Sequence, residues 1–191
     1  MLKNNLPGVA IFAFNRPNHL KKTLKSLSQN LNAKNYDVFI FCDGPKKKGD
    51  KKKIKEVRKI SKNYGNFKSK KYFFRKANYG LYNSLKYGIS KVLKSKKSVI
   101  ILEDDIITNK YFLNYMFHAL NFFNNQKNIG SVTGYSYANC NQDLFLSQRH
   151  ASWGWGTWRH VWDKMKWDNK YIKKYMKRKN FKKEFNRAGN D

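Results

Sequence analysis

The stretch Val99-Ile100-Ile101-Leu102-Glu103-Asp104-Asp105 decides the fold. Its first four residues form a continuous apolar run, which is typical of a strand buried on both faces of a parallel sheet. Three carboxylates follow where that strand should end, and like charges so close together repel one another. A folded protein tolerates them mainly when a cation or a set of donors neutralises them. The sequence therefore predicts a divalent-metal site here, with an acidic loop that caps the next helix as the alternative.

Three apolar runs precede this stretch and are expected to be strands, at residues 9–14, 38–42 and 72–74. Apolar residues at helical spacing follow each of the four runs, in stripes over residues 20–31, 54–60, 81–92 and 112–123. The Lys-rich residues 46–53 are expected to be a solvated loop. This alternation predicts an α/β fold with a mainly parallel central sheet flanked by helices, which binds ligands at the carboxyl ends of its strands.

The pattern changes after Ile129. Short strands are expected at 130–133 and 144–146, and one or two basic helices beyond Trp167. Trp155, Trp158 and Trp162 recur at helical spacing, which favours the buried stripe of a helix. The competing interpretation is that Trp153 or Trp155 stacks against an acceptor sugar.

Composition limits the possible functions. The chain of 191 residues fits one domain of ordinary size, and its net charge of +29 comes from 41 Lys and Arg against 12 Asp and Glu. Such an excess of positive charge points to phosphorylated ligands, anionic membrane or nucleic acid as partners. Most of the charge, however, comes from Lys residues on an expected solvated surface. Two cysteines make no disulfide framework and fit a reducing, cytoplasmic setting. No dinucleotide, P-loop, zincin or serine-hydrolase motif is present.

The acidic run resembles the Asp-X-Asp-type segment of glycosyltransferases with the GT-A (nucleotide-diphospho-sugar transferase) fold. The opening strand that ends in Asn15-Arg16-Pro17 and the later Ser152–Trp158 segment support this resemblance in the same order along the chain. Together they are similar to the N-acetylglucosaminyltransferase I family and to bacterial sugar transferases of surface polysaccharide synthesis. The resemblance covers roughly residues 8 to 168, and relatives continue beyond this chain, so we expect it to be truncated.

The resemblance implies a role for each matching residue. Asp105 is expected to bind the Mn²⁺ or Mg²⁺ that bridges the donor diphosphate, and Glu103 and Asp104 to bind the sugar or ribose. The remaining residues expected to bind the nucleotide-sugar are Ala13, Asn15, Arg16, Asp43, Arg75 and Asn78.

A catalytic base is expected after the Gly-Trp segment if the reaction inverts the anomeric centre. Asp191 is the first candidate and Asp168 the second. Residues 1–134 are interpreted as the nucleotide-sugar-binding half, and residues 135–191 as the start of the acceptor-binding region of the same domain. Trp153 and Trp155 are the acceptor candidates within it.

The predicted function is transfer of a sugar from a nucleotide-diphosphate donor, with UDP-sugars favoured, to a glycan or lipid-linked acceptor. The predicted location is cytoplasmic, with peripheral contact to anionic membrane and no nucleic-acid partner. Two alternatives stay open. A nucleotidyltransferase also uses carboxylates and metal, but needs a Gly-rich basic loop that Asn15-Arg16-Pro17 does not supply. A basic nucleic-acid- or membrane-binding protein would use its Lys runs instead of its acidic triplet.

Overall fold

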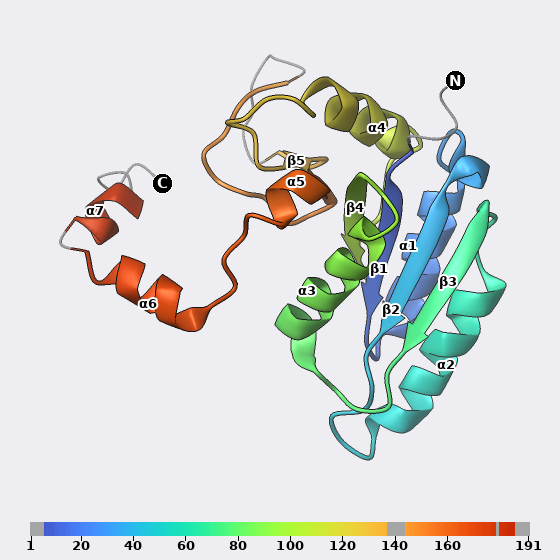
Figure 1. Ribbon diagram of the computed structural model, residues 1–191. Helices are drawn as coiled ribbons and strands as arrows, with labels where there is room; N and C mark the ends of the chain where they lie inside the picture. Colours follow the sequence, from blue (N-terminus) through green and yellow to red (C-terminus); the bar gives the residue numbers. More distant parts are fainter. Residues whose placement is uncertain (1–5, 137–143, 179, 186–191) are drawn as a thin grey trace. The chain divides into compact units, whose positions relative to one another are not determined.

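The computed structural model describes residues 6–136, 144–178 and 180–185. They fall into two compact units, Met1–Arg159 and His160–Asp191. The first unit is built on a sheet of six strands, in the order β3-β2-β1-β4-β6-β5 (Figure 1). The strands are β1 (Gly8–Ala13), β2 (Asp37–Cys42), β3 (Ser69–Phe74), β4 (Ser98–Glu103), β5 (Val132–Thr133) and β6 (Trp155–Trp158).

The first four strands are parallel, as the apolar runs predict. The α-helices of this unit are α1 (Pro17–Ser28), α2 (Asp50–Asn63), α3 (Gly80–Leu93) and α4 (Phe112–Phe122), and a short 3-10 helix spans Ala33–Asn35. Figure 1 shows α1 and α2 on one face of the sheet and α3 on the other. The predicted α/β fold with a mainly parallel sheet between helices is confirmed.

The face of the sheet toward α3 is built on a row of aromatic rings. The strand register aligns Phe12, Phe41 and Phe73, and neighbouring rings stack at centroid distances of 5.1 and 4.7 Å. Gly88 of α3 packs on this row, since a Cβ atom added there would lie 2.5 Å from the Phe12 ring. The missing side chain lets the helix approach the sheet closely, and α3 thereby fixes the strand ends that carry the polar residues.

Two helix boundaries and one expected strand differ from the expectation. The first helix ends at Ser28, and Leu31 lies beyond it with 48% of its surface exposed. The second helix begins at Asp50, inside the expected Lys-rich loop, because Asp50 accepts the backbone N–H groups of the turn before it. Residues 144–146 form no strand.

The Trp-rich segment forms a strand, so the predicted helix through Trp155 and Trp158 is wrong. Their strand, β6, pairs antiparallel with β4 and with β5, and Trp162 falls in a separate short helix, α5 (Arg159–Trp162). Core packing is confirmed for Trp158, which is 1% exposed and donates its indole N–H to Leu120 O over 2.8 Å. The hydrogen bond satisfies the one polar group of a buried ring.

The second unit contains the two basic helices expected near the end of the chain, α6 (Asn169–Met176) and α7 (Phe181–Phe185). Tyr175 of α6 meets the ring of Phe181 at a centroid distance of 5.7 Å. The division of the chain after Arg159 keeps β5 and β6 with the first unit. The functional division at residue 134 stays a prediction.

Among the described residues, we find no helix with the length and apolar character needed to cross a bilayer.

Candidate functional site

The polar residues singled out in the sequence meet at one edge of the sheet, where β1, β2 and β4 end. The parallel register sets Ala13 beside Cys42 and Phe12 beside Glu103. The residues that follow these strands are therefore neighbours in space although they are far apart along the chain. Ala13 itself is buried and positions this edge through its carbonyl, which accepts from Asp43 N at 3.0 Å.

Arg16 holds the two aspartates that follow β4. Its guanidinium donates to Asp105 Oδ2 over 2.8 Å and also contacts Asp104 Oδ1. The Asp104 side chain is 2% exposed, and it accepts a further hydrogen bond from Phe14 N at 3.3 Å. The Asp105 side chain is 40% exposed. Asp104 therefore fixes the loop after β1 from inside the protein, and Asp105 presents its carboxylate to solvent.

Glu103 lies on the α3 side of the sheet, because it is paired with Phe12 and paired residues of neighbouring strands share a face. Its carboxyl group is half-buried. Burial raises its pKa above the ordinary value, and the charges of Asp105 and Asp104 raise it further against the opposing charge of Arg16. Protonation of Glu103 is thus favoured both by its burial and by the two aspartates that follow it.

Asp43 is buried and accepts hydrogen bonds from the start of α3. Its oxygens accept from the backbone N–H groups of Tyr79 and Gly80 at 3.0 Å, and Ser84 Oγ lies 3.4 Å away. These are the N–H groups that a helix leaves unpaired at its N-terminus. In this structure Asp43 joins β2 to α3, and its predicted contact with a base or ribose stays a prediction.

Asn15 and Asn78 connect the loops at this edge. The Asn15 side-chain amide donates to Asp50 Oδ1 over 2.8 Å, which ties the β1 loop to the start of α2. The Asn78 amide donates to Gly44 O over 3.2 Å, and its oxygen accepts from Gly80 N at 3.1 Å. Both side chains lie at the predicted edge, where they brace the loops that would surround a nucleotide.

Arg75 follows β3 and is enclosed by aromatic rings. Its guanidinium lies 4.5 Å from the centroid of Tyr79 and 4.7 Å from that of Tyr87, and it donates to Ser84 Oγ over 3.2 Å. Cation–π contacts of this kind hold an arginine in one orientation. Arg75 thus packs on the side of α3, next to the predicted nucleotide edge.

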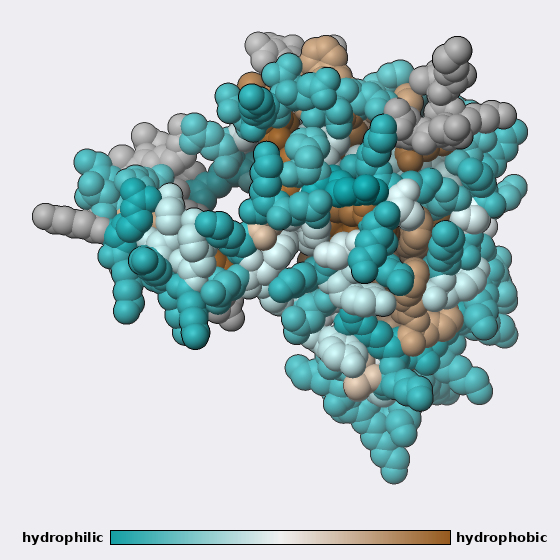
Figure 2. Space-filling view, viewed as in Figure 1, coloured by the Kyte–Doolittle hydropathy of each residue, from teal (hydrophilic) through white to brown (hydrophobic). Residues whose placement is uncertain are grey.

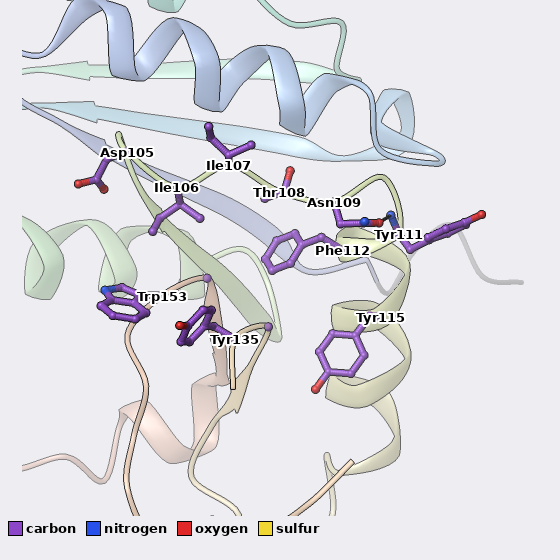
Figure 3. Close-up of a pocket in the computed structure, with 12 residues that line it drawn as sticks. Asp105, Ile106, Ile107, Thr108, Asn109, Tyr111, Phe112, Tyr115, Tyr135 and Trp153 are labelled. Atoms are coloured by element: carbon purple, nitrogen blue, oxygen red, sulfur yellow. Dashed lines mark hydrogen bonds between the residues drawn. The ribbon is translucent and has the colours of Figure 1, made fainter. Parts of the chain in front are cut away.

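A cavity of about 460 Å³ begins at Asp105 and continues along the loop between β4 and α4 (Figure 3). Aromatic and aliphatic side chains form most of its wall, and Tyr135 and Trp153 face each other edge to face at a centroid distance of 4.7 Å. The lining residues are Asp105, Ile106, Ile107, Thr108, Asn109, Tyr111, Phe112, Tyr115, Gly134, Tyr135, Trp153 and Gly154.

Two glycines make room for Phe112 in the wall of this cavity. Gly154 has a positive φ of 66°, and Gly134 N donates to Gly154 O over 2.7 Å. A Cβ atom would lie 2.5 Å from the Phe112 ring at Gly134 and 3.1 Å from it at Gly154. The two backbones can therefore cross only because neither residue has a side chain.

The residues predicted to contact the acceptor or to act as the catalytic base lie in different parts of the chain. Trp153 lines the cavity, whereas Trp155 is outside its lining and its ring packs against His150 at 4.6 Å. Asp168 belongs to the second unit and caps α6, where its carboxylate accepts from Lys170 N at 2.8 Å. Asp191 lies outside the described residues. The roles predicted for these four residues stay predictions.

A single carboxylate at this edge fits a metal ion whose other ligands come from a bound substrate. Within residues 6–136, 144–178 and 180–185, no group of three or more His, Cys, Asp or Glu side chains could hold an ion by itself. Asp105 nevertheless offers an accessible carboxylate beside a cavity. Mg²⁺ is commonly bound by one or two carboxylates together with a substrate's phosphates, so one protein ligand is consistent with such a site.

Two residues that stabilise this edge were not singled out in the sequence. Thr23, buried in α1, donates to the backbone oxygen of Asp104 over 2.8 Å. Asp50 binds Asn15, and hydrogen bonds from Asn15 and from Lys47 N lower its pKa. The available signals were a threonine in the apolar stripe of a helix and a lone acid within a run of lysines.

Comparisons with known proteins agree with this architecture. A family model described as glycosyl transferase family 2 matches residues 8–189. No curated protein gives a significant match. The solved 4-diphosphocytidyl-2C-methyl-D-erythritol synthase from Anaerococcus prevotii is similar with a TM-score of 0.50 and 11% identity, over 100% of this chain and 86% of that one. At such identity the likeness shows the fold alone.

Two further solved structures are similar over part of their length. Mannosyltransferase PcManGT from Pyrobaculum calidifontis, in complex with GDP-Man and Mn²⁺, matches with a TM-score of 0.44 and 11% identity over 69% of this chain and 36% of its own. S. aureus TarS 1-349 matches with a TM-score of 0.42 and 15% identity over 61% of this chain and 32% of its own. The chain spans about a third of these two proteins. Because the family model covers nearly all of its residues, the chain belongs to glycosyl transferase family 2.

Proposed function

We propose that this chain is the nucleotide-sugar-binding part of a metal-dependent glycosyltransferase, which moves a sugar from a nucleotide-diphosphate donor to a glycan or lipid-linked acceptor. One observation carries the proposal. The accessible carboxylate of Asp105 lies where the β1 loop, the end of β4 and an aromatic cavity meet. A donor at the strand ends and an acceptor in the cavity would both reach this point.

Different residues of the chain would contact different parts of the donor. Arg16 keeps 43% of its side chain exposed and can donate to a phosphate as it does to Asp105. Glu103 faces the α3 side, where it would accept from a sugar or ribose hydroxyl. Asp104 and Asp43 position the loops in this scheme, since both are buried and hydrogen-bonded to protein groups.

Asp105 would hold Mn²⁺ or Mg²⁺ together with the donor's diphosphate. When bound, such an ion stabilises the negative charge that develops on the departing nucleotide diphosphate. The fixed guanidinium of Arg16 beside Asp105 supports the same task, because it is already oriented before a ligand arrives.

The cavity supports the acceptor side of the proposal. The faces of Trp153 and Tyr135 suit the apolar face of a pyranose ring, and Asp105 lies at the end of the cavity nearest the donor edge. Asp168 and Asp191 remain the proposed bases for deprotonating the acceptor. UDP-sugars remain the favoured donors, and the cytoplasmic face of a membrane the proposed location.

A thermal-shift series tests donor binding. We expect one class among UDP-, GDP-, CMP- and dTDP-sugars to raise the melting temperature, and to do so more strongly with Mn²⁺. Asp105→Asn should abolish the metal-dependent part of this shift. Glu56→Gln, which makes the same carboxyl-to-amide change at an exposed position of α2, should leave it intact.

Two outcomes would overturn the proposal. The first is a folded protein that no nucleotide-sugar stabilises with metal present. The second is a larger shift with a nucleoside triphosphate than with any nucleotide-sugar, which would favour a nucleotidyltransferase.

A further inference from the structure

The cavity beside Asp105 is apolar in a protein whose surface is mostly hydrophilic (Figure 2). Among the lining residues that the structure describes, Asp105 is the only acid and none is Lys or Arg, although 41 of the 191 residues are basic. Figure 3 shows Phe112, Tyr115, Tyr135 and Trp153 around a common space. The described lining therefore offers no cation to a phosphate or to an acidic sugar.

Hydrogen-bonding groups in this wall are already used within the protein. The Tyr115 hydroxyl donates to Thr133 O over 3.1 Å, and the Asn109 side-chain oxygen accepts from Tyr111 N at 3.0 Å. Burial raises the pKa of Tyr115, so its hydroxyl keeps its proton at neutral pH. A sugar buried here would need a partner for each of its hydroxyls, because an unpaired buried polar group is unfavourable. The wall therefore suits an apolar ligand better than a buried sugar.

The loop that forms one side of the cavity is fixed by α1. Asn30, which is 5% exposed, donates to Thr108 Oγ1 over 3.0 Å and accepts from Leu113 N at 2.8 Å. Ser26 Oγ accepts from Thr108 N at 3.1 Å. The loop is thus held in place by protein groups alone. A preformed, mostly apolar cavity of about 460 Å³ is of the usual size for a small-molecule site.

We propose that the acceptor carries an uncharged apolar group on its sugar, an alkyl chain or an aromatic ring, and that this group occupies the cavity. The inference rests on the proposed function, because it concerns the acceptor side of the same site. The sugar would lie between Asp105 and Trp153, next to the donor edge, and the apolar group would extend toward Phe112 and Tyr115 (Figure 3). Burial of this group would supply most of the affinity.

Isothermal titration with two glycosides of the same sugar tests the inference. Methyl β-D-glucopyranoside and n-hexyl β-D-glucopyranoside differ only in the length of the alkyl group. Each is titrated into the whole chain without donor, below the concentration at which the hexyl compound forms micelles. The hexyl glycoside should bind at least about ten-fold more tightly, because its additional methylene groups leave water.

Substitutions locate this preference in the cavity. Ile106→Asn places an amide in the lining and should weaken hexyl glycoside binding about ten-fold, while the methyl glycoside binds as before. Leu81→Asn makes the same change at an exposed position of α3 outside the lining and should retain the hexyl affinity. Trp153→Ala should weaken both glycosides, whereas Phe122→Ala, at an exposed position of α4 outside the lining, should weaken neither.

Three outcomes would overturn the inference. Equal affinity for the two glycosides would show that the site recognises the sugar alone. The second outcome is a folded chain that binds neither glycoside, and the third is an equal loss of hexyl binding in Leu81→Asn and Ile106→Asn. If circular dichroism shows that Ile106→Asn is unfolded, the wild-type comparison still tests the preference, and Trp153→Ala tests its location.

Failure of the inference can be told from failure of the proposed function. A metal-dependent thermal shift with a nucleotide-sugar, together with equal affinity for the two glycosides, would reject the apolar acceptor and leave donor binding intact. A hexyl preference without any donor shift would indicate an apolar ligand site in a protein that binds no donor. That result would overturn the assignment of the ligand as an acceptor.

Discussion

Arg16 Nη1 lies 2.8 Å from Asp105 Oδ2, and the same guanidinium also contacts Asp104. One cation thus serves two adjacent carboxylates, of which the first is buried and the second is open to solvent. Burial raises the pKa of Asp104, and the charge of Arg16 opposes that rise. Arg16 is therefore the internal counter-charge of this edge, whatever ligand binds there.

Arg16→Gln should destabilise the fold, because it leaves the buried Asp104 without its cation. Since the Arg16 side chain is 43% exposed, water offsets part of the loss, and we expect a decrease of about 1 to 2 kcal/mol. Urea unfolding at neutral pH measures it. Adding Asp104→Asn should recover part of the loss, and Lys22→Gln at an exposed position of α1 should change little. An unchanged stability of Arg16→Gln would refute the counter-charge role.

Asp43→Ala should loosen the start of α3, because it removes the acceptor for the N–H groups of Tyr79 and Gly80. We expect a loss of about 1 to 2 kcal/mol, as for other helix caps. Compared with the wild type, amide hydrogen exchange should accelerate more at the first turn of α3 than in β4. A variant that keeps its stability and its exchange pattern but loses donor binding would instead assign Asp43 to the nucleotide.

Gly154→Ala should destabilise the protein and narrow the cavity, because the residue has φ +66° and its Cβ would lie 3.1 Å from the Phe112 ring. A non-glycine residue in this conformation costs roughly 1 to 2 kcal/mol. Gly130→Ala is the control, since a Cβ atom there meets nothing within 4 Å. Thermal unfolding of the two variants compares them directly. Equal stability of both would contradict the crossing of Gly134 and Gly154 beside Phe112.

Asp37 should make the stability of the protein pH-dependent. Burial favours the protonated acid, but hydrogen bonds from Lys96 at 2.6 Å and from Ser69 at 2.6 Å bring the pKa of Asp37 below its ordinary value. An acid with a lowered folded pKa stabilises the fold above its unfolded pKa, and this contribution disappears as the pH falls through the folded pKa.

Asp37→Asn should therefore cost about 1 kcal/mol at neutral pH. The difference from the wild type should shrink below about pH 4, where the unfolded carboxyl group becomes protonated. Urea unfolding at a series of pH values measures both. A difference that stays constant down to acid pH would show that Asp37 acts through its shape and not through its charge.

The sequence predicted the strands of the parallel sheet because their burial on both faces leaves uninterrupted apolar runs. It also predicted that Asp105, Arg16 and Asp43 lie at one edge, since parallel strands end on the same side. What it could not show was which carboxylate faces solvent. Asp104 is the buried one and accepts from Phe14 N in the loop after β1, which lies 90 residues away along the chain.

The strand β6 was missed for a different reason. Trp155, Trp158 and Trp162 satisfy helical spacing, and three apolar residues cannot distinguish one helix stripe from a strand followed by a short helix. Pairing decided the outcome, because Trp155 lies beside Ile101 of β4 in the sheet. Asp43 was likewise assigned to the nucleotide by the resemblance and by its place after the second strand, while its partners Tyr79 and Gly80 come from the start of α3.

The pairing of β6 with β4 has a consequence for synthesis of the chain on the ribosome. β4 leaves the ribosome more than fifty residues before Trp155, so its outer edge stays open until β6 arrives. An open edge beside the apolar run Val99–Leu102 is a template for pairing with another nascent chain. Chains shortened before Trp155 should therefore aggregate, and the nascent protein depends on the prompt arrival of a strand from its second half.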